Sequence, residues 1–303
     1  MDITLKKTSD DKQPIVFFGT EDFSLESLKG LIKSGYQVAA VVTKPDSKKG
    51  RGQTISQPAV KKLALEHKIP VWQPNKIAEI AEDIKKLDHP AGVLVSFGKI
   101  IPKSIIELFK PGIINVHPSL LPAYRGPSPI ESAIAEGLHK TGITIMQLSA
   151  KMDAGPIYGQ LTYNLDGQET KPELYEIMAR AGAATLLSLL PSILDGTLKP
   201  KPQDESLATY CKLLDKQDSW LKPDEMSAKS AERRIRAHLG FPRSKIKIDG
   251  QEIIITSAHV ADSKTTPLDV EFKGGSFLAI DRLTVPGGHE MTAKAYLNGL
   301  RKS

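Results

Sequence analysis

The stretch "NVHPSLLPAYRG", residues 115–126, brings together two side chains that could do chemistry. Asn115 and His117 end an apolar run, and side chains two residues apart in a strand point to the same face. The Asn amide offers two uncharged N–H donors, and a His can donate, accept or transfer a proton near neutral pH. Such a pair suits a carbonyl group under attack, where one preorganised donor lowers the barrier by roughly 3 kcal/mol.

A carboxylate is needed to orient the imidazole, and Asp153 in "SAKMDAGPI" is the best candidate. It follows the apolar stretch 144–147, in a loop bounded by Gly155 and Pro156, so we expect it at the same end of the sheet as His117. A His–Asp pair would favour the imidazolium and fix the ring. The structural alternative stays open, because Asn before a loop often makes an Asx-turn and a lone His at a strand end is more often structural.

Other chemistries have less support in the sequence. No His-Glu-x-x-His or paired-His spacing occurs, so we predict no metal site. Ser119 and Ser128 lack a Gly-x-Ser-x-Gly elbow, which disfavours covalent catalysis. Gly19 and Thr20 have neither Gly-x-Gly-x-x-Gly nor a Walker lysine around them, which disfavours a nicotinamide or nucleotide site.

The elements that must position these residues alternate in type along the first two thirds of the chain. Apolar runs predict strands at 15–18, 38–42, 92–96, 113–116 and 144–147, and amphipathic stretches predict helices at 24–33, 57–67, 77–86 and 129–136. Such alternation indicates an α/β fold with a parallel sheet and helices on both faces. In these sheets ligands bind beyond the carboxyl ends of the strands, where Asn115 and His117 are expected.

The last third of the chain has a different pattern. A long helix over 173–194 precedes a stretch rich in Pro and Lys, so we predict domains at 1–196 and 210–303 joined by a linker at 197–209. After a helix at 227–238, short strands are predicted at 245–248, 252–256, 270–272 and 277–280, separated by glycine turns. This spacing indicates a small β-barrel or sandwich.

Composition limits the class of protein. The 303 residues carry a net charge of +6 and one cysteine, Cys211, which excludes an internal disulfide framework and fits a reducing compartment. The polar stretch 1–13 does not resemble a signal peptide, and the apolar stretch 181–194 is too short to span a membrane. We therefore expect a cytoplasmic protein that is not membrane-bound.

Three groups of basic side chains have two open interpretations. They are Lys48, Lys49 and Arg51 in a glycine-bearing loop, Arg233 and Arg236 on a predicted helix, and Lys245 and Lys247 alternating along a predicted strand. Most charge runs are solvent-facing and inert. The alternative is contact with a nucleic-acid backbone, which carries no base specificity.

The motif "INVHPSLLPAYRGPSPI" resembles the signature of the folate-dependent formyltransferases. Further stretches resemble the same family in the same order: "FFGTEDFSLESLKGL", "VVTKPDSKKGRGQ", "TGITIMQLSAKMDAGPI" and "LTVPGGHEMTAKAYLNGLR". Several matches spread over both predicted domains are far more specific than one short motif.

The resemblance implies formyl transfer from 10-formyltetrahydrofolate to the α-amino group of methionyl initiator tRNA. It implies a Rossmann-like N-terminal formyltransferase domain and a C-terminal open β-barrel, OB-like, that holds tRNA. It implies no metal, and we expect a monomer. The residues that it implicates are Asn115, His117 and Asp153 in catalysis, Phe97, Lys99, Ile100, Ser119, Leu120, Leu121 and Pro122 at the folate, and the basic side chains named above at the tRNA.

Three alternatives to this function remain. The formyl acceptor could be a nucleotide-sugar amine or another small amine. The reaction could be hydrolysis of formyltetrahydrofolate to formate. Finally, the chain could be a tRNA-binding module without catalysis, although binding alone would not require Asn115, His117 and Asp153 together.

Overall fold

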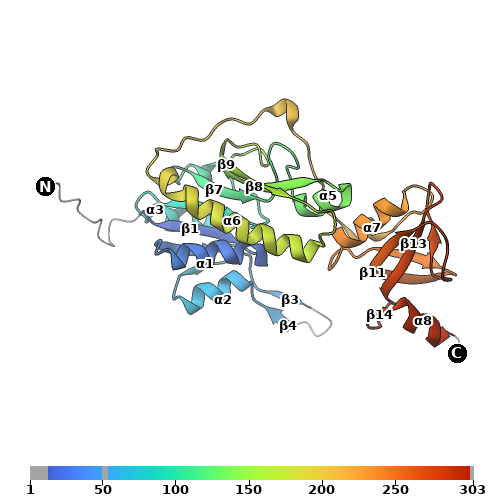
Figure 1. The fold of residues 1–303 in the computed structure, drawn as a ribbon. Helices are drawn as coiled ribbons and strands as arrows, with labels where there is room; N and C mark the ends of the chain where they lie inside the picture. The colour runs from blue at the N-terminus through green and yellow to red at the C-terminus, as the bar shows by residue number, and fades with distance from the viewer. Residues whose placement is uncertain (1–12, 50–53, 301–303) are drawn as a thin grey trace. The chain divides into compact units, whose positions relative to one another are not determined.

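A computed structural model of the chain, drawn in Figure 1, describes residues 13–49 and 54–300. Contacts divide these residues into two compact units. Unit 1 comprises the chain up to Gly126, Gly142–Tyr163 and Glu176–Tyr210, and unit 2 comprises Pro127–Thr141, Asn164–Tyr175 and the chain from Cys211.

Unit 1 is built on a sheet with the strand order β5-β2-β1-β6-β7-β8-β9. The bounds are β1 (Ile15–Gly19), β2 (Val38–Val42), β5 (Val71–Trp72), β6 (Ala91–Val95), β7 (Ile113–His117), β8 (Lys140–Gln147) and β9 (Ile157–Asn164). The pairs from β5 to β7 are parallel, whereas β8 runs antiparallel to β7. The mostly parallel α/β sheet predicted from the sequence is confirmed.

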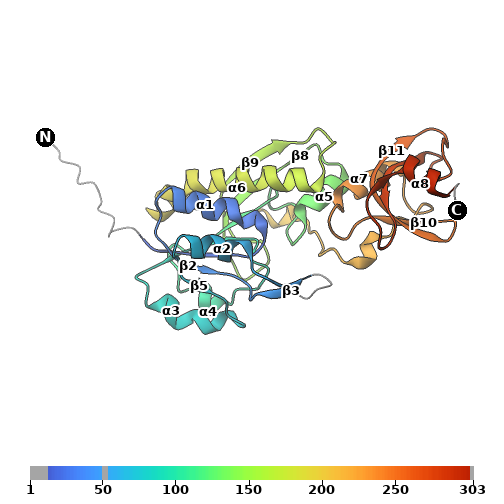
Figure 2. The same cartoon turned by 90° about the horizontal axis from the view of Figure 1, so that it is seen from below.

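Helices cover both faces of this sheet, because parallel strands need crossover connections. They are α1 (Leu25–Lys33), α2 (Ala59–Glu66), α3 (Ala81–Lys85), α4 (Lys103–Ile106) and the long α6 (Lys171–Leu194). Figure 2 shows α1 and α6 on one side of the sheet and α3 and α4 on the other. Two glycines let α6 lie close to α1 and to the sheet. Gly30 of α1 lies against Leu187 of α6, and Gly182 of α6 lies against Val116 of β7.

The opposite face of the sheet packs on an aromatic and aliphatic core. Phe18 of β1 makes edge-to-face contacts with Phe97 and Phe109. Ile105 of α4 and Ile113 of β7 belong to the same buried cluster. This core packs against β6 and β7, the strands whose carboxyl ends carry the candidate site.

Some elements were not predicted from the sequence. A short hairpin of β3 (Ser47–Lys49) and β4 (Thr54–Ser56) follows β2, and β5 has only two residues. The edge strand β9 was missed because its exposed residues are largely polar and give no apolar run. The expected helix over 77–86 is split into a 3-10 helix, Ile77–Ile80, and α3.

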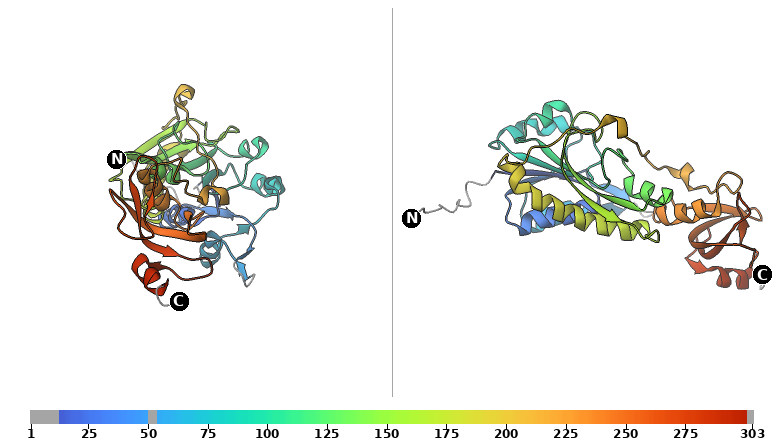
Figure 3. Two further views of the ribbon diagram at one scale, coloured as in Figure 1. Left: turned by 90° about the vertical axis from the view of Figure 1, so that its right-hand side faces the viewer. Right: turned by 45° about the horizontal axis from the view of Figure 1, so that its top comes forward.

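Unit 2 contains an antiparallel sheet with the order β10-β11-β13-β12, to which β14 adds beside β13. Its elements are α5 (Pro129–Glu136), α7 (Ala228–Ala237), β10 (Lys245–Ile248), β11 (Gln251–Ala261), β12 (Val270–Glu271), β13 (Phe277–Thr284), β14 (Met291–Thr292) and α8 (Ala293–Leu300). The sheet curls into a half-barrel, visible in Figure 3, which confirms the expected OB-like domain. Ile235 of α7 packs in its core with Ile253 and Leu278.

Two segments that precede the connector in the chain group with unit 2. Helix α5 packs against α7. Arg233 of α7 donates to the carbonyl of Glu136, and Lys171 pairs with Glu131. The connector after α6 groups with unit 1 instead. Contacts between segments that lie far apart in the chain cannot be read from the order of the residues. The domain limits 1–196 and 210–303 therefore stay a prediction.

Helix α6 is long and apolar enough to span a membrane by length and composition alone. It is also partly buried inside the protein, and Leu186, Leu190 and Ile193 are fully enclosed. A core helix passes the same test, so this one helix is weak evidence for a membrane span.

Candidate active site

Asn115 and His117 are the last polar positions of β7 and share one face of the sheet. Val116, between them, points to the other face, where it meets Gly182 of α6. Both polar side chains are buried, and Asn115 is only 5% exposed. The strand therefore presents an amide and an imidazole together, as the alternation of the sequence predicts.

The amide of Asn115 makes no hydrogen bond to any residue in the described ranges 13–49 and 54–300, although the residue is only 5% exposed. Among the described residues, the fully enclosed side-chain atoms without a partner belong to Ser27 and Thr256, so the Asn115 amide is open enough to meet a water or a ligand. An amide held ready without an internal partner can donate to a bound carbonyl oxygen, which is the role that the sequence analysis assigned to it.

The imidazole of His117 lies between a carbonyl and a carboxylate. Its Nε2 is 3.0 Å from the carbonyl oxygen of Tyr124. Because a carbonyl only accepts, Nε2 carries the hydrogen and the neutral ring has its lone pair on Nδ1. Nδ1 faces Oδ2 of Asp153 at 3.8 Å. At 3.8 Å these two atoms are within ion-pair distance but beyond hydrogen-bond distance, so Nδ1 is the atom that can accept a proton and the carboxylate is the negative charge beside it.

Asp153 reaches His117 by a different route from the one expected. Asp153 was expected to follow a strand that runs parallel to β7, and that premise is wrong because β8 is antiparallel to β7. Gln147 at the end of β8 pairs with Ile114, near the start of β7. The loop 148–156 then folds back toward the other end of β7, which gives the predicted His117–Asp153 proximity.

Strained backbone accompanies this geometry. Asp153 has φ of 46° and Tyr124 has φ of 58°, the left-handed region that non-glycine residues rarely adopt. Oδ2 of Asp153 accepts a 2.8 Å hydrogen bond from the backbone N–H of Gly126. The two loops are thus connected around His117. The loop 118–126 supplies the carbonyl of Tyr124 and the N–H of Gly126, and the loop 148–156 supplies the carboxylate of Asp153.

The loop 118–126 is fixed by its own hydrogen bonds. Ser119 is buried, and its hydroxyl donates to the carbonyl of Ala123 at 2.7 Å. Thr144 donates to the carbonyl of Ser119 and accepts from the N–H of Leu121. Leu121 is buried as well, whereas Leu120 and Pro122 are half-buried. Of the four residues expected at the folate here, Leu120 and Pro122 have side-chain surface to offer, and Ser119 and Leu121 shape the loop.

The loop 96–100 also contains one buried side chain and one side chain that is open to a ligand. Phe97 is buried against Phe18, so its ring belongs to the core and only its backbone borders the loop. Lys99 donates to the carbonyls of Pro74 and Asn75, which ties this loop to the next one. Ile100 is 91% exposed and is therefore the apolar side chain of this loop open to a ligand.

The basic residues expected at tRNA fall into three groups. The side chains of Lys48 and Lys49 and the whole of Arg51 lie outside the described residues. Arg233 donates to the carbonyl of Glu136 and Arg236 donates to the carbonyl of Glu169, so both side chains have internal partners.

The two lysines of β10 form the third group. Lys245 pairs with Glu252 and lies 4.2 Å over the ring of Trp220. Lys247 is exposed, with its ammonium 5.9 Å from the same ring. Contact of any of these residues with tRNA stays a prediction.

Three supporting residues were not singled out from the sequence: Arg125 within the loop 118–126, and Gln203 and Glu205 in the connector. Arg125 is fully buried, 1% exposed, and forms a two-pronged ion pair with Glu205. This contact raises the pKa of Arg125 and lowers the pKa of Glu205. Gln203 bonds to the Asp153 loop. The polar residues of an extended connector give no signal that it returns to a site.

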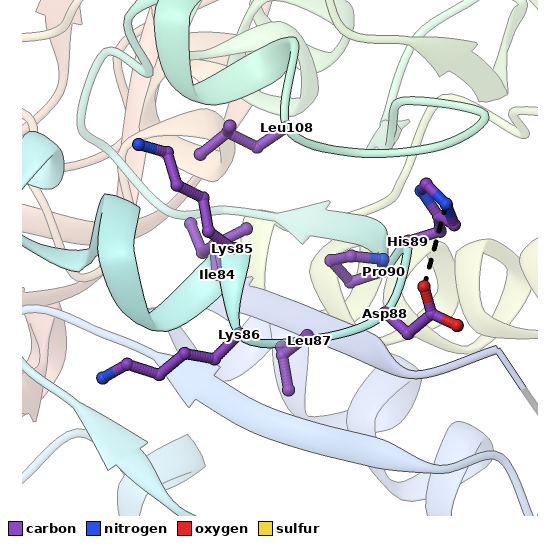
Figure 4. Close-up of a pocket in the computed structure, with 8 residues that line it drawn as sticks. All are labelled: Ile84, Lys85, Lys86, Leu87, Asp88, His89, Pro90 and Leu108. Atoms are coloured by element: carbon purple, nitrogen blue, oxygen red, sulfur yellow. Dashed lines mark ion pairs between the residues drawn. The ribbon is translucent and has the colours of Figure 1, made fainter.

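A surface hollow of about 370 Å³ lies elsewhere in unit 1 and is drawn in Figure 4. It is lined by Ile84, Lys85, Lys86, Leu87, Asp88, His89, Pro90 and Leu108. Pro90 directly precedes β6, so the hollow lies at the amino ends of the parallel strands, opposite to His117. It is not part of the candidate site. Among the described residues, no three metal-ligating side chains cluster together.

Comparison with known proteins shows the family of the chain. Residues 13–190 match the family described as formyl transferase. The methionyl-tRNA formyltransferase of Sulfurihydrogenibium sp. is 41% identical over 85% of this chain and 83% of that protein. The methionyl-tRNA formyltransferase of Halorhodospira halophila is 36% identical over 95% of this chain and 96% of that protein.

Solved structures show the same fold at lower identity. HypX from Aquifex aeolicus in complex with tetrahydrofolic acid has a TM-score of 0.67 and 16% identity, covering 95% of this chain and 47% of that chain. WlaRD, a sugar 3N-formyl transferase studied with dTDP and 5-N-formyl-THF, has a TM-score of 0.66 and 19% identity, covering 89% and 97%. With the family match over more than half of the chain and the near full-length relatives, the chain belongs to the formyl transferase family, in the branch of the methionyl-tRNA formyltransferases.

Proposed function

We propose that this chain transfers a formyl group from 10-formyltetrahydrofolate to the α-amino group of methionyl initiator tRNA and so supplies formylmethionyl-tRNA for translation initiation. The support is its near full-length likeness to proteins that are named for this reaction. We expect a monomer, because binding one tRNA requires no second subunit. We also expect the protein to act in the cytoplasm.

The observation that carries the proposal is the amide of Asn115, which is buried, has no hydrogen-bond partner among the described residues, and shares a face with His117. Negative charge develops on the formyl oxygen when an amine attacks the formyl carbon. A neutral donor that is already oriented stabilises that charge more strongly than water does, because no solvent has to reorient as the charge develops.

The reaction also moves a proton, and His117 with Asp153 is the part of the site that can handle it. A free α-amino group has a pKa around 8, so a useful fraction is nucleophilic at neutral pH without a strong base. As the new C–N bond forms, the nitrogen must lose a proton. In this ring orientation Nδ1 of His117, beside Asp153, accepts it and returns it to the folate nitrogen as the old C–N bond breaks.

The co-substrate supplies the activated formyl group, so the chain needs to bind and orient it. Leu120, Pro122 and Ile100 offer apolar surface on two loops that follow β7 and β6. Such surface suits a flat heterocycle, and the buried Ser119 and Leu121 keep the first loop in shape. The basic side chains of unit 2 and of the β3–β4 hairpin are the proposed tRNA contacts.

The test uses 10-formyltetrahydrofolate with a labelled formyl group and methionyl initiator tRNA. We expect label in an ester-linked product on the tRNA. Folate consumption without labelled tRNA would indicate hydrolysis or another amine and would contradict the proposal. Replacing the tRNA with a dTDP-amino sugar separates those two outcomes, because only a sugar formyltransferase would then give a labelled sugar.

The role of Asn115 is tested by Asn115→Ala in the same assay. We expect kcat to fall about 100- to 1,000-fold, the usual cost of losing one oxyanion donor. Because the amide makes no hydrogen bond among the described residues, the melting temperature should change little. A wild-type kcat in this variant would exclude the assigned role.

A further inference from the structure

The connector that follows α6 returns to the candidate active site. The side-chain nitrogen of Gln203 donates to two backbone carbonyls of the loop 148–156, that of Asp153 at 2.8 Å and that of Gly155 at 2.7 Å. All three residues belong to unit 1. One amide group therefore spans the turn from which the Asp153 carboxylate projects.

The other end of the Gln203 amide is fixed as well. Its oxygen accepts from Nε and Nη2 of Arg125, at 3.2 and 2.8 Å. A reversed amide would place its NH₂ against the guanidinium and its oxygen against two carbonyls, which is donor against donor and acceptor against acceptor. Glu205 holds the same guanidinium from the connector side. The orientation of the Gln203 amide is therefore determined by its surroundings.

The turn at Asp153 needs such support. Its φ of 46° places a non-glycine residue in the left-handed region, a strained conformation that persists only where neighbouring contacts impose it. The Gly126 N–H bond to Oδ2 fixes the carboxylate, but the backbone of the turn is tied by the two Gln203 bonds. Without them the carboxylate can turn away from His117.

We propose that Gln203 is a positioning residue for the reaction proposed above: its amide, oriented by Arg125, holds Asp153 in the turn that presents its carboxylate to His117. The inference rests on the proposed function only for its effect on catalysis. The claim that Gln203 determines the position of the Asp153 carboxylate can be measured without any assay of activity.

The test variant is Gln203→Glu. It keeps an oxygen for Arg125 and places a second oxygen, in place of the NH₂ donor, against the two carbonyls. We expect kcat to fall about 10- to 100-fold, because an error near 1 Å in a catalytic group costs up to about 100-fold. The KM values for folate and tRNA should stay within about twofold, because Gln203 bonds to Arg125 of the loop 118–126 and not to Leu120 or Pro122, which offer the surface for folate. The matched control is Gln168→Glu, the same change at an exposed glutamine, which should leave kcat unchanged.

A double-mutant cycle separates positioning from a general loss of structure. In an Asp153→Asn background, Gln203→Glu should lower kcat by less than about threefold, because the group that it positions is already gone. Multiplicative losses in the double variant would show that Gln203 does not act through Asp153. A rise in the KM for tRNA at unchanged kcat would also overturn the proposal, because it would make the connector a binding element only.

A measurement without turnover completes the test. The amide proton of Gly126 donates to Oδ2 of Asp153, so its NMR resonance and exchange rate report where the carboxylate lies. We expect an upfield shift and faster exchange in Gln203→Glu and no change in Gln168→Glu. If the wild type fails to formylate methionyl-tRNA, the proposed function fails while this readout still decides the role of Gln203. An unchanged Gly126 resonance in Gln203→Glu would overturn the inference.

Discussion

At the scale of single residues, the chain contains two buried histidines in contrasting environments. His117 faces a carbonyl and a carboxylate, which suits a ring that handles protons. His238, at the end of α7, is 3% exposed and has the cations Arg234, Lys171 and Lys212 around it, opposed by the carboxylate of Asp218. Burial, reinforced by these cations, lowers the pKa of His238 to about 4.

This environment predicts a pH dependence of stability. The His238 ring stays neutral in the folded chain down to about pH 4, whereas an unfolded histidine titrates near pH 6.5. Between these values the unfolded chain binds more protons, so the free energy of unfolding falls as the pH falls through this window. We expect a loss of about 2 kcal/mol between pH 7 and pH 5, measured by urea unfolding.

The control for this prediction is His238→Gln, which removes the titrating group and keeps a polar side chain. Its unfolding free energy should depend less on pH by the same amount between pH 7 and pH 5. If wild type and variant show equal pH slopes, another group is responsible for the loss.

At the scale of elements, the loop 148–156 decides whether the site forms. Because β8 runs antiparallel to β7, this loop must turn back along the sheet edge, and it passes very close to the end of β8. A Cβ on Gly155 would lie 1.8 Å from the carbonyl oxygen of Gln147 and 3.1 Å from Met146. A side chain there forces backbone, and not only a flexible side-chain tip, to move.

We therefore expect Gly155→Ala to lower the free energy of unfolding by about 1–3 kcal/mol, the usual range for overpacking. Formyl transfer should fall at least tenfold, because Asp153 lies two residues away. Gly299→Ala is the matched control: apart from its chain neighbours and the backbone of its own helix, no atom of the described residues lies within 4 Å of its added Cβ, and helix propensity favours Ala by up to about 1 kcal/mol. A Gly155→Ala protein with normal melting and turnover would show that the loop has more room than the structure indicates.

At the scale of the whole molecule, the net charge of +6 is not one uniform tRNA-binding surface. Arg236 is 14% exposed in its side chain, forms a two-pronged pair with Glu232 and donates to the carbonyl of Glu169. Arg233 caps α5 at Glu136. Lys247, in contrast, is exposed on β10. The structure thus separates arginines with structural partners from a lysine whose charge faces solvent.

This separation predicts different effects of two substitutions. Arg236→Ala should lower the free energy of unfolding by about 1–2 kcal/mol, because charged hydrogen bonds are lost. Lys247→Ala should change it by less than about 0.5 kcal/mol but weaken tRNA binding and reduce the slope of log K against log salt by about 1. Thermal melts and tRNA titrations at several salt concentrations measure both effects. A normal salt slope in Lys247→Ala would assign Lys247 to the inert surface.

The sequence alone determined the parts of this protein that depend on local pattern. Alternation of apolar runs and amphipathic stretches predicted the parallel sheet, and the period of two in β7 predicted that Asn115 and His117 share a face. Motifs spread along the chain predicted the family, which the relatives confirm. These features are local because strand and helix periods, and motif spacing, are set by residues near each other in the chain.

Only the tertiary structure decided the features that join distant residues. It reversed β8, brought Asp153 to His117 through a loop that folds back, and fixed the imidazole with the backbone carbonyl of Tyr124. It also returned Gln203 to a turn fifty residues earlier and buried Arg125 between connector residues. No periodicity encodes such contacts, because strand direction and hydrogen bonds between distant loops depend on how the whole chain satisfies its buried polar groups at once.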